Sequence, residues 1–327
     1  MTLANHTQKR SLSRSHPEKG ELILCFCSLF CLLLLLRNTE ATSTFMTHGL
    51  AVCAGVVIPS LFPFTVLSEL ILSGRFFRRL LCRLASPLCH LLGLSDDGIC
   101  AVLLGMLCGF PIGPRCAVHA YQSGRISRDE AERVIAFSGP PSSAFLIGAV
   151  GTSLFEDRSF GILLYACVLL SALLTGILLN LLRPKNVTPF FALSPSVDGH
   201  ATVAKRLTAA VASATQSMLL VCAYVVFFST IVGALGLILE PFGLPEPLSA
   251  FLHALFELSG GTARAAALSS PRAARILAAF AAGWSGLSVH CQTRSFCDGT
   301  DLTLSLYLPA KLMQAGFTTA MIAILFR

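Results

Sequence analysis

The sequence alternates between long apolar runs and short charged clusters. The longest runs lie at 22–36, 49–73, 159–182, 207–239 and 302–326, and Glu69 and Lys311 stand out as charges inside them. About 20 apolar residues are enough to cross the hydrocarbon core of a bilayer as a helix. The pattern therefore predicts an all-α polytopic membrane protein with about seven or eight helices.

The first residues of the chain are polar and basic. Residues 1–20 contain several Lys and Arg side chains, which predicts a tail that stays in the cytoplasm. A signal peptide would also have a basic segment followed by an apolar run. Because the chain downstream is membrane-like as well, we favour a retained first membrane helix at 21–37.

Four shorter apolar runs lie between the long ones, at 98–113, 138–155, 248–258 and 276–293. The first of them would form a helix of roughly 24 Å, which is short of a hydrocarbon core of ~30 Å. Glycine and proline interrupt the chain at these runs, in the sequences GFPIGP, SGPP, LSGG and GWSG. Pro59 and Pro63 interrupt the second long run, where we expect a kink or a break.

A polar, amphipathic stretch separates the first two short runs. Ser127 followed by Glu130 has the spacing of a capping box, which predicts the start of a helix. Asp129, Glu130 and Glu132 alternate with arginines on this helix. We therefore expect these carboxylates to form a solvated face.

The two halves of the chain follow the same plan of long run, short run, glycine turn, Arg-bearing connection, second short run and closing run. Aligning FSGPPSS with FAAGWSG places Ser142 on Ser285, and GFPIGPR occupies the place of LSGGTAR. We predict one repeat at 46–182 and another at 207–327, joined by a linker at 183–206. A cytoplasmic linker requires the two repeats to be inverted.

Interrupted helices at matching positions of two halves are typical of transporters that bind a solute near the bilayer midplane. A helix that ends inside the bilayer exposes backbone groups without partners, at a cost of several kcal/mol each in hydrocarbon. Such ends are stable when they are buried in protein or line a polar cavity, where they offer hydrogen bonds and a dipole to a solute. Alternatively, the glycines serve only the close packing of helices.

Composition narrows the function classes. Hydrophobic residues make up 54% of the chain and charged residues only 13%, against roughly 25% charge in soluble domains. The net charge of +7 comes from cations at the ends of apolar runs, so we expect no nucleic-acid binding. The 13 cysteines have no paired CxxC spacing, and catalytic motifs are absent. We therefore expect no metal site, no cofactor and no enzyme.

The segment 109–151 carries a GFPIG turn, a GRIS helix start and the run FSGPPSSAFLIGAVG. In these motifs the chain resembles the YlbJ-type sporulation integral membrane proteins of the wider nucleoside-recognition (Gate) family, and FELSGG and GLSVHCQ fit the second half. The chain departs from that family at 139–141, where Gly-Pro-Pro replaces an Asn-containing turn. The resemblance implies two Gate-like repeats with broken or re-entrant helices and a role in sporulation, with nucleosides or dipicolinate as candidate solutes.

The candidate solute-binding residues lie at the four interruptions. Arg115 would pair with an anionic solute or a carboxylate, or else extend to the interface. Glu257 would be an ion or proton site or a member of an ion pair, for which Lys311 is a candidate partner. His290 and Gln292 would hydrogen-bond a polar solute, although a lone His is more often a core residue. The full set is Gly109, Pro111, Gly113, Arg115, Ser138, Gly139, Pro140, Ser142, Glu257, Ser259, Gly260, Gly261, Ser285, Gly286, Ser288, His290 and Gln292.

The sequence thus predicts a multi-pass protein of the bacterial inner membrane or forespore membrane that translocates a small anionic or nucleoside-like solute. The alternative is a structural or scaffold membrane protein required for spore envelope assembly. The expected partners are the lipid bilayer, the solute, and a second copy of the chain or other sporulation membrane proteins. A wet cavity lined by the interruptions would favour transport, whereas a dry core would favour the scaffold.

Overall fold

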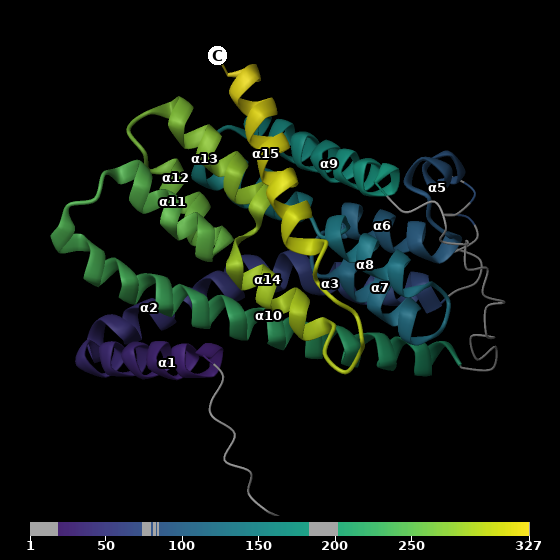
Figure 1. Cartoon of the computed structure of the whole chain (residues 1–327), viewed down its shortest axis with the longest axis horizontal. Coiled ribbons are helices and arrows are strands. Elements are labelled where there is room, and N and C mark those ends of the chain that lie inside the picture. The colour runs from purple at the N-terminus through teal and green to yellow at the C-terminus, as the bar shows by residue number, and fades with distance from the viewer. Residues whose placement is uncertain (1–18, 74–79, 81–82, 84, 183–201, 327) are drawn as a thin grey trace, which may run out of the picture.

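The computed structural model describes residues 19–73, 80, 83, 85–182 and 202–326, so most of the predicted linker lies outside the described residues. The described part contains fourteen α-helices, further 3-10 and π segments, and no strand (Figure 1). The predicted all-α class is confirmed. The expected number of helices was too low, because the connections between the short runs form helices of their own.

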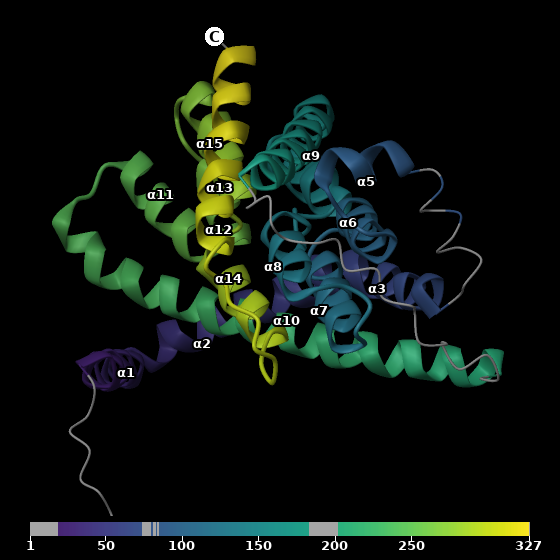
Figure 2. The same ribbon diagram turned by 45° about the vertical axis from the view of Figure 1, so that its right-hand side comes forward.

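Among the described residues, five helical segments are long and apolar enough to cross a membrane. They are α1 (Lys19–Arg37), the continuous segment Thr39–Ile71, α9 (Arg158–Leu181), α10 (Val203–Leu239) and α15 (Tyr307–Leu325). Helix α10 has 37 residues, which corresponds to about 55 Å. In Figure 2, α10 runs the length of the molecule, and α1 lies at its edge beside α2.

The segment that contains Pro59 and Pro63 does not end at either proline. Helix α2 (Thr39–Val52) continues through a π-helical turn, η1 (Cys53–Val57), into α3 (Ile58–Ser73). A π turn is one of the known ways in which a helix accommodates a local change in its hydrogen bonds. Here it ends two residues before the first proline, and the helix then runs through the second. The prediction of a kink or break is therefore realised as a π turn and not as a helix end.

The first half contains two helix breaks. Helix α5 (Ser86–Leu92) leads to α6 (Asp96–Cys108), which ends at the first break, residues 109–111; α7 (Ile112–Gln122) and α8 (Arg128–Phe137) follow. The second break, residues 138–143, leads into the π-helical segment η2 (Ala144–Leu154) and then α9. Both breaks fall at the glycine and proline residues that predicted them, since these residues leave the backbone without regular helical hydrogen bonds.

The start of α8 confirms one prediction and corrects another. The hydroxyl of Ser127 accepts a hydrogen bond from the Glu130 N–H at 3.2 Å, as an N-cap does. The Glu130 carboxylate, however, is buried and accepts hydrogen bonds from the N–H and the hydroxyl of Ser95. The prediction that Asp129, Glu130 and Glu132 form a solvated face was therefore wrong for Glu130, which links the start of α8 to the start of α6.

The chain after α10 continues through a further series of helices. After η3 (Glu240–Phe242) come α11 (Glu246–Phe256), α12 (Leu258–Ala266), α13 (Pro271–Trp284), α14 (Gly286–Phe296) and α15. The third break lies at Glu257 and the fourth at Ser285. The turn predicted at Ser259–Gly261 was misplaced, because Glu257 caps α12 and these residues form its first turn.

Glycines allow the broken helices to touch through their backbones. A Cβ added to Gly105 on α6 would lie 2.0 Å from the Ser138 carbonyl oxygen, and one added to Gly113 on α7 would lie 2.1 Å from the same oxygen. Two helices thus approach one backbone group at the second break. Because the obstacle is backbone and not a flexible side chain, neither site can accept a methyl group without displacing the chain.

We expect Gly105→Ala to lower the stability of the protein by about 1–3 kcal/mol, as overpacking of a tight contact does. Gly316→Ala is the matched control, because a Cβ at Gly316 on α15 meets no atom within 4 Å. Thermal unfolding of both variants in the same detergent measures the difference. Equal unfolding temperatures for Gly105→Ala and the wild type would contradict the packing described here.

Candidate functional site

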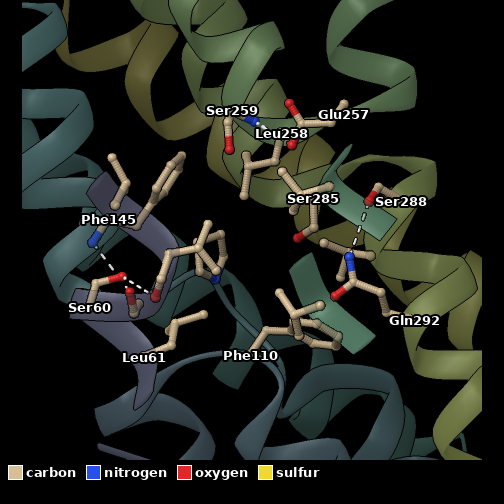
Figure 3. A pocket seen from close by; sticks show the side chains of 17 residues that line it. Ser60, Leu61, Phe110, Phe145, Glu257, Leu258, Ser259, Ser285, Ser288 and Gln292 are labelled. Carbon is tan, nitrogen blue, oxygen red and sulfur yellow. Dashed lines mark hydrogen bonds between the residues drawn. The ribbon is translucent and has the colours of Figure 1, made fainter. Parts of the chain in front are cut away.

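All four breaks meet around one cavity, which we call the central cavity (Figure 3). Its volume is about 70 Å³. The breaks supply one part of its wall, and the segment around η1 and the middle of α10 supply the rest. The lining residues are Val56, Val57, Ser60, Leu61, Phe110, Pro141, Ser142, Phe145, Val221, Val225, Glu257, Leu258, Ser259, Ser285, Ser288, Val289 and Gln292.

The first and second breaks are joined through their backbones. The Phe110 N–H donates to the Pro140 carbonyl oxygen at 2.8 Å. Gly109 has φ +83° and ψ −179°, a conformation found almost only in glycine. A Cβ at this position would lie 2.5 Å from the Ser142 Cα. The glycine therefore provides both the turn and the close contact that aims Phe110 at the central cavity.

The third and fourth breaks form a similar pair. Gly286 has φ +81°, and a Cβ there would lie 3.0 Å from the Leu258 nitrogen and 3.1 Å from the Glu257 Cα. The Glu257 carboxylate accepts hydrogen bonds from the Ser259 and Gly260 N–H groups at 3.0 and 2.6 Å. Glu257 is therefore the N-cap of α12 as well as part of the cavity wall.

Gln292 places a free acceptor at the central cavity. Its Nε2 donates to the Ser288 hydroxyl at 3.1 Å, one turn earlier on α14. Its Oε1 has no hydrogen-bond partner among the described residues, although the side chain is only 1% exposed. Figure 3 shows this oxygen pointing into the cavity, away from Ser288. A buried acceptor without a partner costs about 1–3 kcal/mol, which a water molecule or a ligand in the cavity would recover.

Lys311 does not pair with Glu257 in the described structure. Its ammonium donates to the Gly139 carbonyl oxygen at 3.1 Å, to Gln314 Oε1 at 3.3 Å and to the Ser285 hydroxyl at 3.5 Å. The side chain is 1% exposed. This cation therefore lies behind the cavity wall, where it connects the second break to the fourth, and the proposed ion pair with Glu257 was wrong.

Arg115 lies outside the central cavity. Its guanidinium forms an ion pair with Glu69 of α3 and donates to the Ser213 hydroxyl of α10 at 2.6 Å. These three residues line a second cavity of about 260 Å³, here called the charged chamber, together with Cys116, Val118, His119, Gln122 and Phe296. Of the roles considered for Arg115, pairing with a carboxylate is the one that the structure shows.

His290 also lies away from the central cavity. Its Nδ1 is 3.1 Å from the Tyr307 hydroxyl, and its ring is edge-on to Trp284 with centroids 4.3 Å apart. Six of the predicted residues line the central cavity: Ser142, Glu257, Ser259, Ser285, Ser288 and Gln292. The remainder shape the breaks or neighbouring helix starts: Gly109, Pro111, Gly113, Ser138, Gly139, Pro140, Gly260, Gly261 and Gly286.

Sequence reasoning missed the aromatic and long-helix parts of the wall. Phe110 stands directly beside predicted break residues, Phe145 lies three residues after Ser142, and Ser60 lies in the proline-containing stretch, so these signals were in the sequence. Val221 and Val225 of α10 gave no such signal, because they resemble the other apolar residues of that helix. A third cavity of about 530 Å³, here called the wide cavity, lies near the C-terminal end of α10. Its wall includes Gly236, His253 and Arg264.

A comparison with curated proteins finds a relative along nearly the whole chain. The chain is 27% identical over 343 aligned positions to the sporulation integral membrane protein YlbJ of Bacillus subtilis (strain 168), and the alignment covers 94% of this chain and 83% of that protein. The chain is thus similar to this YlbJ protein along nearly its whole length. This agrees with the resemblance in the motifs and supports a sporulation-associated, multi-pass membrane protein. No family model matches the chain, and no solved structure matches it.

We expect Glu257→Ala to destabilise the protein by about 1 kcal/mol, because the first N–H groups of α12 lose their acceptor. Glu246→Ala serves as the control, since Glu246 is an exposed carboxylate in the first turn of the neighbouring helix α11. Thermal unfolding in detergent compares the two variants. If both substitutions had the same effect, Glu257 would not act as the cap.

Proposed function

We propose that this protein is a carrier that moves a small solute across the membrane and binds it in the central cavity. The observation that supports this proposal most strongly is the meeting of all four helix breaks at one cavity, with the unpartnered Gln292 Oε1 directed into it. Broken helices around a shared site are the arrangement by which many transporters bind their substrates.

The lining favours a solute with a flat apolar body and a polar edge. Phe110, Phe145 and Val225 offer apolar surface, and Gln292 offers an acceptor to a donor group on the solute. The Glu257 carboxylate in the wall disfavours a free anion, and Arg115, the expected anion ligand, is engaged with Glu69. We therefore place nucleoside-like solutes ahead of dipicolinate-type dianions.

The small volume of the central cavity bears on how the carrier would work. About 70 Å³ holds on the order of five water molecules. A nucleoside-sized solute therefore needs the breaks to separate, as in alternating access, where one repeat moves against the other around the site. In this proposal the two predicted repeats, 46–182 and 207–327, are the moving parts, and the structure is a closed state.

The scaffold alternative accounts less well for the polar groups. A protein whose breaks served only packing would gain stability by replacing Gln292 with an apolar residue, since its Oε1 has no partner in the described structure. The name of the relative places that protein in sporulation. We extend this context to the proposed carrier and place its activity in the membranes of a sporulating cell.

Uptake by reconstituted vesicles tests the proposal. We expect wild-type vesicles to accumulate a labelled nucleoside, with dipicolinate as the competing candidate, and Gln292→Leu to reduce uptake about tenfold, the equivalent of ~1.4 kcal/mol. Gln216→Leu is the matched control, because Gln216 is an exposed residue of α10 that does not line the central cavity.

Uptake of neither solute above that of protein-free vesicles would overturn the proposed function. Equal uptake by the wild type and Gln292→Leu would remove Gln292 from the binding site while leaving transport in place. A preference for dipicolinate over the nucleoside would reverse our order of solutes.

A further inference from the structure

The three cavities follow one another along α10. Ser213 lines the charged chamber, Val221 and Val225 line the central cavity, and Gly233 and Gly236 line the wide cavity. Ser213 and Val221 are eight residues apart on one face of the helix, a distance of about 12 Å. The charged chamber therefore lies next to the central cavity along α10.

Two phenylalanines occupy the space between these cavities. Phe110 lines the central cavity and Phe296 lines the charged chamber, and their ring centroids are 6.2 Å apart. Both belong to an apolar cluster that also contains Met218, Val221 and Val289. The cluster places apolar side chains from the first break, from α14 and from α10 between the central cavity, whose wall is mostly apolar, and the charged chamber.

We propose that Phe110 and Phe296 form the barrier that a solute crosses between the central cavity and the charged chamber. This inference rests on the proposed transport function and adds the residues that control passage. An apolar constriction excludes water and ions because their hydration is lost there, and such constrictions close channels.

The charged chamber suits the far side of such a barrier. The side chains of Arg115 and Glu69 are 18% and 29% exposed, and Gln122 in the same wall is exposed. Helix α3 ends at Ser73, and the sequence continues with Arg75, Arg78, Arg79 and Arg83. Arginines clustered at the end of an apolar run favour the cytoplasmic side of the membrane. The chamber therefore leads from the cytoplasmic face, and a polar solute that enters it meets the phenylalanine pair next.

Labelling of a cysteine behind the barrier tests this inference. Ser288→Cys places a thiol in the wall of the central cavity, and a charged, membrane-impermeant methanethiosulfonate is applied from the cytoplasmic side of vesicles. Peptide mass spectrometry reads each position separately, so the native cysteines remain. We expect Phe296→Ala, made together with Ser288→Cys, to label at least about tenfold faster than Ser288→Cys alone.

Two controls accompany the experiment. Phe227→Ala removes an exposed ring of α10 that lines neither cavity and is expected to leave the labelling rate unchanged. Gln122→Cys reports access to the charged chamber itself and is expected to label rapidly with or without Phe296. If Phe296→Ala fails to elute as a folded protein, Phe296→Leu replaces it, with a smaller expected increase of a few fold.

The outcomes separate this inference from the function on which it rests. Unchanged labelling of Ser288→Cys in a folded Phe296 variant would show that the pair is no barrier, whatever the uptake result. Faster labelling in a protein whose wild type transports neither solute would retain the barrier and overturn the carrier. Rapid labelling of Ser288→Cys with both phenylalanines in place would also overturn the inference.

Discussion

The structure depends on one constraint, which is that backbone N–H and C=O groups inside a bilayer must find partners within the protein. Four helices end among the apolar segments, and nearby groups of the protein form hydrogen bonds with the backbone at these breaks. Phe110 donates to the carbonyl of Pro140, Glu257 accepts from the first N–H groups of α12, and Lys311 donates to the carbonyl of Gly139. The first and second breaks lie together because the second supplies the acceptor for an N–H group of the first.

Small residues make this mutual satisfaction geometrically possible. Gly109 and Gly286 both have positive φ, and each faces the backbone of the other break in its half, at Ser142 and Glu257. Any larger residue would push the two backbones apart and enlarge the cavity at the cost of the contacts that close it. The same glycines therefore provide the close packing of helices and shape the wall of the central cavity.

Much of this architecture could be predicted from the sequence, because apolar runs and Gly/Pro interruptions act locally. The first, second and fourth breaks fall where GFPIGP, SGPP and GWSG predicted them. The third does not, since capping by Glu257 draws Ser259–Gly261 into α12. The partners of Arg115 and Lys311 depend on which helices become neighbours, and no spacing in the chain determines that. The part of the cavity wall that α10 contributes could not be predicted either, because it also depends on which helices become neighbours.

Helix α14 has a mechanical consequence. Gln292, whose oxygen faces the central cavity, and Phe296, whose ring meets Phe110, stand one turn apart on the same short rod. A force that tilts or rotates this rod displaces both side chains together, since a helix of this length moves as a rigid piece. A solute that displaced Gln292 would therefore also displace Phe296, a member of the proposed barrier, one turn further along α14.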